Sequence, residues 1–293
     1  MRADRASSTA TLIATATVFL ARDPRLAGLV PRGAAEICAR CLEALSPLRL
    51  AAVELASRPA LRWAARLAER ATIPGLLAHF MLRKRWIEDA ARAALADGIS
   101  QLVVVGAGFD TLAARLAADY PQVRFIEVDH PATQRVKLAA CDFPKNLLFV
   151  AADLAGTGLE SVLANSLERQ KPSFFVIEGL LMYLTEAQIA TLFESLARLQ
   201  HAGGRVAFTQ MEPARDGRSR FHNATFLVKG LLALWREPFR SSLPRGRAAL
   251  LLNKLSYALL YMAGAEDLRR KFLGRETADV PLAEGEMLYL AQR

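Results

Sequence analysis

The chain has 293 residues, of which 53% are hydrophobic and 23% charged, which is typical of a globular protein and excludes a disordered one. Its net charge of +9 favours anionic partners, such as an acidic small molecule. The basic residues lack the interleaved aromatic side chains of a single-strand-binding groove, so we expect no nucleic-acid partner. Three cysteines are too few for a disulfide framework and suit a reducing cytoplasm, where we expect the protein.

Residues 1–100 have the apolar spacing of helices, and we expect them to form a helical cap and lead-in. Prolines interrupt this pattern at Pro31, Pro47, Pro59 and Pro74. The apolar stretch over residues 10–21 is too short for a membrane span and predicts an amphipathic helix of a soluble protein, so we expect no membrane partner. Cys38 and Cys41 form a Cys-x-x-Cys pair inside a helical stretch without two further zinc ligands, so we predict no metal site.

From residue 101 short apolar runs alternate with helical stretches, which predicts one α/β domain over residues 101–293 with a doubly wound, mostly parallel sheet of seven strands. The runs are Leu102–Val105, Arg124–Val128, Leu147–Val150, Phe174–Ile177, Arg205–Thr209 and Glu286–Ala291, with a weaker one near Tyr257–Met262. The alternation stops after Thr209. Helices are predicted around Phe226–Trp235 and Arg247–Lys254, within an insertion over about residues 213–280.

A glycine turn, Gly106-Ala-Gly108, follows the first predicted strand. Ligands of an open parallel sheet bind beyond the carboxyl ends of the strands, where glycines let the backbone approach them. Alone, the pair is weak evidence, because ordinary tight turns also use it. Thr111 stands where a dinucleotide fingerprint has its third glycine. That difference disfavours a nicotinamide dinucleotide and favours S-adenosylmethionine, which carries no phosphate.

Acidic residues follow the second and third predicted strands. Asp129 comes about 20 residues after the glycine turn, where a carboxylate can accept both ribose hydroxyls. It could also cap the helix that starts at Pro131. Asp153 can accept the adenine amino group while Leu154 lies against the ring, or it can simply close a turn. Together with the glycines, these positions predict a nucleoside site.

The fourth predicted strand ends in Ile177-Glu178-Gly-Leu-Leu-Met-Tyr183. Enzymes that methylate the amines of bases place Asn/Asp-Pro-Pro-Tyr/Phe here, and neither proline is present. The segment therefore argues against a DNA or RNA amino-methyltransferase. Tyr183 is either a residue of the site mouth or an ordinary packing residue.

These segments together resemble the leucine carboxyl methyltransferase family. The resemblance rests on Gln101–Thr111, Phe125–Gln134 and Ile177–Leu184, and it extends over about residues 79–211, with weaker similarity at residues 7–24 and 285–293. It implies a Rossmann-like, class I methyltransferase fold that uses S-adenosylmethionine, with a helix at residues 7–24 over the cofactor. The family includes the enzyme that esterifies the C-terminal leucine of a protein phosphatase, and bacterial relatives that act on polyketides and other small acids.

The resemblance also implies a donor site and its residues. The expected cofactor contacts are Arg83, Arg85, Gly106, Ala107, Gly108, Asp110, Asp129, His130, Asp153, Leu154, Glu178 and Gly179. The family grips the donor's carboxylate with an arginine on the helix before the first strand. Arg83 is its counterpart by spacing and Arg85 is a rival, although both could be solvated helix charges. The variable region after residue 213 is where such enzymes choose the substrate.

The chemistry that we expect is O-methylation of a small acid. A carboxylate is ionised at neutral pH and needs no general base, but it needs a cation, for which an arginine of residues 215–247 is the candidate. The expected catalytic residues are Arg83, Tyr183 and His222. A phenol or alcohol acceptor is the alternative and would require a base such as His222 or Glu178. A nicotinamide-dependent reductase and a catalytically silent cofactor-binding module also stay open.

Overall fold

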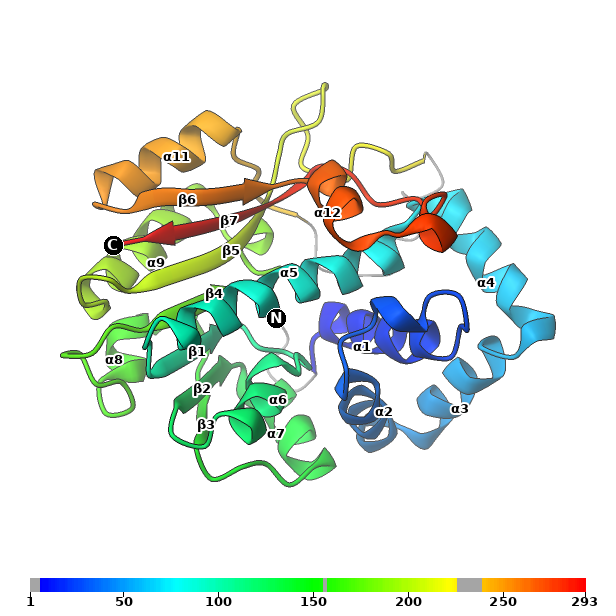
Figure 1. The fold of residues 1–293 in the computed structure, drawn as a ribbon, viewed down its shortest axis with the longest axis horizontal. Coiled ribbons are helices and arrows are strands. Elements are labelled where there is room, and N and C mark those ends of the chain that lie inside the picture. The colour runs from blue at the N-terminus through cyan, green and yellow to red at the C-terminus, as the bar shows by residue number, and fades with distance from the viewer. Residues whose placement is uncertain (1–5, 155–156, 226–238) are drawn as a thin grey trace.

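The computed structural model describes residues 6–154, 157–225 and 239–293. A central sheet lies between two layers of helices, and further helices from the N-terminal third extend one layer to the side (Figure 1). The predicted helix at Phe226–Trp235 lies outside the described residues.

Seven strands form one sheet in the order β3-β2-β1-β4-β5-β7-β6. They are β1 (Gln101–Val105), β2 (Arg124–Asp129), β3 (Leu147–Ala151), β4 (Phe174–Ile177), β5 (Arg205–Met211), β6 (Ala258–Ala263) and β7 (Glu286–Gln292). The strands β1 to β5 pair in parallel, whereas β7 pairs antiparallel with both β5 and β6. The prediction of a doubly wound, mostly parallel sheet of seven strands is therefore confirmed. The order reverses between β1 and β4, the place where such sheets leave a ligand crevice.

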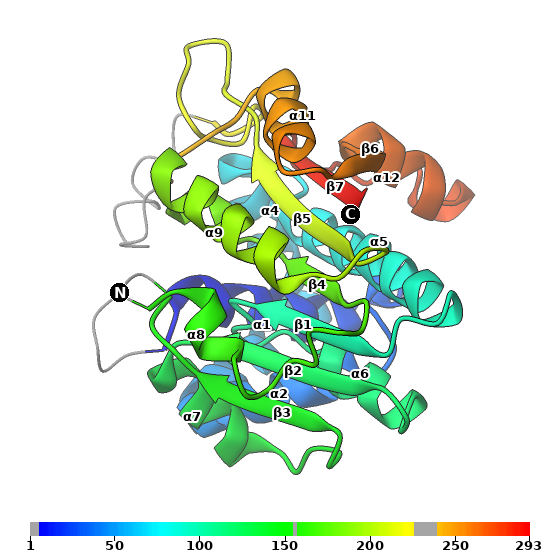
Figure 2. The same cartoon turned by 90° about the vertical axis from the view of Figure 1, so that its left-hand side faces the viewer.

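The helices cover both faces of this sheet (Figure 2). They are α1 (Ser8–Ala21), α2 (Ala34–Leu45), α3 (Pro47–Ala56), α4 (Pro59–Thr72), α5 (Leu76–Ala96), α6 (Leu112–Asp119), α7 (Pro131–Ala140), α8 (Leu159–Leu163), α9 (Glu186–Leu199), α11 (Arg245–Lys254) and α12 (Ala265–Phe272). Short 3-10 helices lie at η1 (Ala27–Leu29), η2 (Leu181–Tyr183) and η3 (Arg275–Thr277). The helix predicted at Arg247–Lys254 is confirmed as α11.

Each strand sends alternate side chains to opposite faces, so the sheet separates two hydrophobic cores. Val104 and Phe125 belong to the core shared with α1, α2, α5 and α6. Val103 and Ile126 belong to the core shared with α8, α9 and α11. Because both faces are covered, β1 is buried along its whole length. The N-terminal helices thus pack on the same core as one face of the sheet.

Two of the N-terminal helices, α3 and α4, begin at predicted interruptions, because Pro47 and Pro59 occupy their first-turn positions. The helix predicted over residues 10–21 exists as α1, but the prediction that it is amphipathic was wrong. Only Ser8 of this helix is exposed, because α2, α3 and α5 pack around it. Its many alanines and threonines are small enough to allow packing on several sides. No helix in the described ranges is long and apolar enough to cross a membrane.

Candidate functional site

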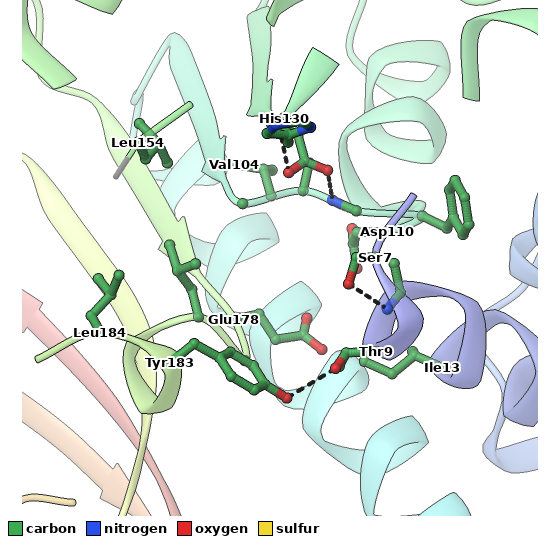
Figure 3. A pocket seen from close by; sticks show the side chains of 18 of the residues that line it. Ser7, Thr9, Ile13, Val104, Asp110, His130, Leu154, Glu178, Tyr183 and Leu184 are labelled. Atoms are coloured by element: carbon green, nitrogen blue, oxygen red, sulfur yellow. Dashed lines mark hydrogen bonds between the residues drawn. The ribbon is translucent and has the colours of Figure 1, made fainter. Parts of the chain in front are cut away.

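A pocket of about 300 Å³ opens at the carboxyl ends of β1 to β4, where the strand order reverses (Figure 3). Ser7, Thr9 and Ile13 close one side of it from the start of α1. Among the residues expected to contact the cofactor, those that line the pocket are Gly106, Ala107, Gly108, Asp110, Asp129, His130, Asp153, Leu154, Glu178 and Gly179. Four segments far apart in sequence therefore meet at one cavity.

The turn after β1 needs its glycines for two reasons. Gly106 and Gly108 have φ angles of +72° and +53°, a left-handed conformation that side chains disfavour. A Cβ on Gly106 would also approach Leu180 to 3.1 Å, and one on Gly108 would approach the Cβ of Ala10 to 3.0 Å. The glycines thus let α1 and the loop after β4 close on the turn.

Asp129 ties the end of β2 to this turn. Its Oδ2 accepts the backbone N–H of Gly108 and its Oδ1 accepts the backbone N–H of His130, each over 2.7 Å. Burial raises the pKa of Asp129, and these two hydrogen bonds oppose the rise. The side chain that caps α7 is His130, whose Nδ1 accepts from the backbone of Ala132. Capping by Asp129, which the sequence left open, therefore does not occur.

Lys84 of α5 reaches the same pocket. Its Nζ lies 3.1 Å from Oε1 of Glu178 and forms an ion pair with Asp110. Burial alone would raise the pKa of Asp110, but the charges of Lys84 and Lys137 outweigh it and lower that pKa to about 2. The lysine thus joins the loops that follow β1 and β4, and its ammonium group borders the cavity.

The sequence profile of the leucine carboxyl methyltransferase family matches residues 10–197, which include most residues of this pocket. The chain belongs to this family. The resemblance noted in the sequence is therefore confirmed.

Relatives of known sequence carry the name "putative S-adenosyl-L-methionine-dependent methyltransferase". One from Mycolicibacterium paratuberculosis is 34% identical over 142 residues, which cover 46% of each chain. One from Streptomyces avermitilis is 30% identical over 135 residues, which cover 44% of this chain and 47% of the relative. The chain spans about half the length of the curated relatives that it matches.

A crystal structure described as a putative methyltransferase from Thermobifida fusca has the same fold. It superimposes with a TM-score of 0.56 at 18% identity, covering 87% of this chain and 94% of that chain. The likeness confirms the predicted class I methyltransferase architecture.

The family arginine expected on the helix before β1 does not border the pocket. Arg83 is 2% exposed, with Nε 2.9 Å from Glu178 and Nη1 2.9 Å from Glu286. His79 also contacts Glu286, through Nε2 at 2.9 Å. Arg83 therefore supports Glu178 from behind the cavity wall, and it does not line the cavity.

The rival, Arg85, points elsewhere. Its Nη1 donates to the carbonyl of Gly28 over 3.2 Å, and its guanidinium lies 4.8 Å from the ring centre of Phe272. Successive residues of a helix point about 100° apart. Only Lys84 of these three basic neighbours lines the pocket. The resemblance pointed to Arg83 and Arg85, whereas the residue that lines the pocket, Lys84, lies between them.

Tyr183 and Arg240 lie at the pocket from the loop after β4 and from the variable region. The hydroxyl of Tyr183 lies 3.0 Å from that of Thr9, across the cavity (Figure 3). Arg240 is exposed, and its backbone N–H donates to the carbonyl of Met182 over 2.7 Å. No acidic side chain in the described part of the chain pairs with its guanidinium. Arg240 falls within residues 215–247, where the sequence predicted a clamp.

His222 lies outside the described lining of the pocket. Its Nε2 is 3.3 Å from the carbonyl oxygen of Glu212. It packs under Gly285, where a Cβ would come within 2.6 Å of the imidazole. The structure therefore gives no geometric support to His222 as a base.

The two cysteines of the Cys-x-x-Cys pair do not line the pocket. Cys38 and Cys41 are buried in α2. Burial raises the pKa of their thiols to about 11 and about 12. Both are therefore neutral thiols at physiological pH. Among the described residues, no group of three or more His, Cys, Asp or Glu could hold a metal ion.

Proposed function

We propose that the chain is an S-adenosylmethionine-dependent O-methyltransferase that esterifies the carboxylate of a small acid of natural-product type. Membership of the leucine carboxyl methyltransferase family and the names of the relatives support this donor. The observation that carries the acceptor class is Arg240, an exposed arginine at a pocket otherwise rich in carboxylates. A guanidinium that has no acidic partner among the described residues is suited to bind a planar carboxylate through two hydrogen bonds.

The electrostatics of the pocket support this donor. Asp110, Asp129, Asp153 and Glu178 line it, whereas its only lysine and arginine among the described residues are Lys84 and Arg240. S-adenosylmethionine carries a positive sulfonium, a positive ammonium and one carboxylate. A surplus of carboxylates therefore complements the net charge of the cofactor. The glycine turn supplies backbone close to the cavity without side chains that would obstruct it.

Each part of the donor has a candidate partner. Asp129 would hold the ribose hydroxyls, and Asp153 with Leu154 would hold the adenine. We assign the donor's carboxylate to Lys84, because this lysine lines the cavity whereas Arg83 does not. Glu178 then lies beside the lysine, where it can accept from the donor's ammonium group.

The residues of the chain would act mainly by positioning. Arg240 would hold the acceptor's carboxylate while Tyr183 and Thr9 restrict its approach from one side. When bound, S-adenosylmethionine supplies a methyl group on a sulfonium, and a carboxylate oxygen can take it without losing a proton. Such a reaction needs no general base. The described lining agrees with this, because its only histidine is His130, the N-cap residue of α7.

The experiment incubates the full chain with methyl-labelled S-adenosylmethionine and a panel of aromatic and aliphatic acids and phenols. Labelled product is then treated with mild alkali, which cleaves a methyl ester and leaves an ether intact. We expect the label to be released as methanol. A label that survives alkali would overturn the carboxylate assignment and support a phenol or alcohol acceptor. Tight binding of S-adenosylhomocysteine without transfer to any compound would instead favour a silent cofactor-binding module.

A further inference from the structure

The helix α4 has its charged side toward the protein. Arg66 pairs with Asp23, Arg62 donates to the carbonyls of Ser57 and Arg22, and Glu69 accepts the backbone N–H of Leu77 over 2.9 Å. No residue of α4 is buried. In an ordinary surface helix the apolar side faces the core. Here the inward contacts are instead mainly polar.

The apolar side of α4 faces solvent. Trp63 and Leu67, one helical turn apart, are 64% and 58% exposed. Ala60 and Ala64 are exposed on the same side of the helix. In Figure 1 α3 and α4 form the edge of the molecule farthest from β6 and α11. We call Ala60, Trp63, Ala64 and Leu67 the α4 face.

The charges around this face are positive. Arg58 precedes α4 and Arg70 lies in its last turn, and both are exposed. Neither guanidinium has an acidic partner within residues 6–154, 157–225 and 239–293. The acids of the same region are already engaged, since Glu54 pairs with Arg22 over 2.8 Å and Glu69 binds backbone.

We propose that the α4 face binds the surface of an anionic lipid bilayer. A tryptophan and a leucine on one side of a helix with arginines at its ends match a helix that lies in the bilayer interface. Each arginine near an anionic surface strengthens binding about fivefold. The sequence predicted no membrane partner, because its apolar stretches are too short to span a bilayer. This surface attachment needs none.

A second copy of the chain fits the face less well. In a two-fold symmetric dimer the face would meet itself, so Arg58 and Arg70 of one copy would approach those of the other. Without a free acid on α3 or α4 to oppose them, this contact would bring like charges together. Lipid phosphates provide the opposite charge.

The experiment sediments the full chain with vesicles of phosphatidylcholine alone, and of phosphatidylcholine mixed equally with phosphatidylglycerol. We expect binding to the anionic vesicles, weakening as salt is added, and little binding to the neutral ones. The variant Trp63→Gln/Leu67→Gln should lose at least tenfold in affinity. Leu250→Gln is the matched control, because Leu250 is 68% exposed on α11 at the opposite end of the molecule, and it should bind as the parent does.

A second variant, Arg58→Gln/Arg70→Gln, tests the charges at the two ends of α4. It should weaken binding to the anionic vesicles and leave binding to the neutral vesicles unchanged. Retained affinity for S-adenosylhomocysteine shows that each variant is folded, since α4 contributes no residue to the described pocket lining. Equal sedimentation of the parent and Trp63→Gln/Leu67→Gln would overturn the proposal. So would self-association in solution that this variant abolishes, because the partner of the face would then be a second copy.

Discussion

Oε1 of Glu178 lies 3.1 Å from Nζ of Lys84, and the same ammonium group pairs with Asp110. One lysine of α5 therefore connects the ends of two adjacent parallel strands, β1 and β4, at the pocket. Behind it, Arg83 contacts the same oxygen of Glu178, with Nη2 2.8 Å from Oε1. Two consecutive basic residues thus differ in position: Arg83 is buried behind the wall of the pocket, and Lys84 lines the pocket.

The first prediction concerns Lys84→Met. We expect affinity for S-adenosylhomocysteine to fall about 10- to 100-fold, the value of a charged hydrogen bond. Affinity for methylthioadenosine, which lacks the amino-acid portion, should change little. Calorimetry measures both, and Arg85→Met serves as control because Arg85 lies away from the pocket. Equal losses for the two ligands would mean that Lys84 only shapes the cavity.

Replacement of Arg240 by alanine tests the acceptor site. The KM for an acid substrate should rise about tenfold or more, while affinity for S-adenosylhomocysteine stays the same. Arg240→Lys should restore only part of the loss, because an ammonium cannot match a carboxylate with two parallel hydrogen bonds. Arg247→Ala is the control, since Arg247 is exposed and pairs with Glu186 over 3.3 Å. A fall in donor affinity for Arg240→Ala would place this arginine at the donor instead.

The variant Gly108→Ala, compared with a control glycine, distinguishes the effect of backbone strain on stability from the effect of pocket closure on donor binding. The control is Gly203→Ala, because Gly203 also has a positive φ, +84°, and a Cβ there would meet nothing within 4 Å. Both variants should lose about 1–2 kcal/mol of unfolding free energy, measured by urea denaturation. Only Gly108→Ala should also weaken S-adenosylhomocysteine binding, because its Cβ would press on Ala10 of α1. Similar donor affinities in the two variants would contradict a role for this close approach.

The dependence of the unfolding free energy on pH should show how much the buried carboxylate of Glu286 stabilises the fold. Burial alone would raise the pKa of this carboxyl, but the charge of Arg83 and the hydrogen bond with His79 lower it to about 2, from 4.5. In the pH interval between these values the unfolded chain binds a proton that the folded chain does not. The resulting stabilisation, about 3 kcal/mol, is present above pH 4.5 and is lost as the pH falls to about 2.

Glu286→Gln should therefore be less stable at pH 7 and should take up about one proton fewer on unfolding in that interval. Urea denaturation at a series of pH values measures both quantities. Asp279→Asn is the exposed control: a hydrogen bond from Arg25 lowers the pKa of Asp279, but solvent screens its charge, so little should change. An unchanged pH profile for Glu286→Gln would show that the buried ion pairs do not control acid stability.

Several site residues could be predicted because their positions depend on local pattern. Asp129, Asp153 and Glu178 follow apolar runs closed by turns, and parallel strands bring such positions to one edge of the sheet. Arg240 was predicted only as a member of a region. Its place at the pocket depends on a backbone contact with Met182, a residue 58 positions earlier in the chain.

The sequence by itself determined the strands, the glycine turn and the carboxylates at the strand ends, because hydrophobic runs and turn residues act over a few neighbouring positions. Only the tertiary structure decided which side of each helix faces the cavity, the rest of the protein or solvent. The packing of α5 on the sheet decides that Lys84, and not Arg83 or Arg85, reaches the cavity. Likewise, the partners of Arg66 and Glu69 turn Trp63 outward. A helix can rotate about its axis without changing its sequence pattern, and only contacts with distant segments select one rotation.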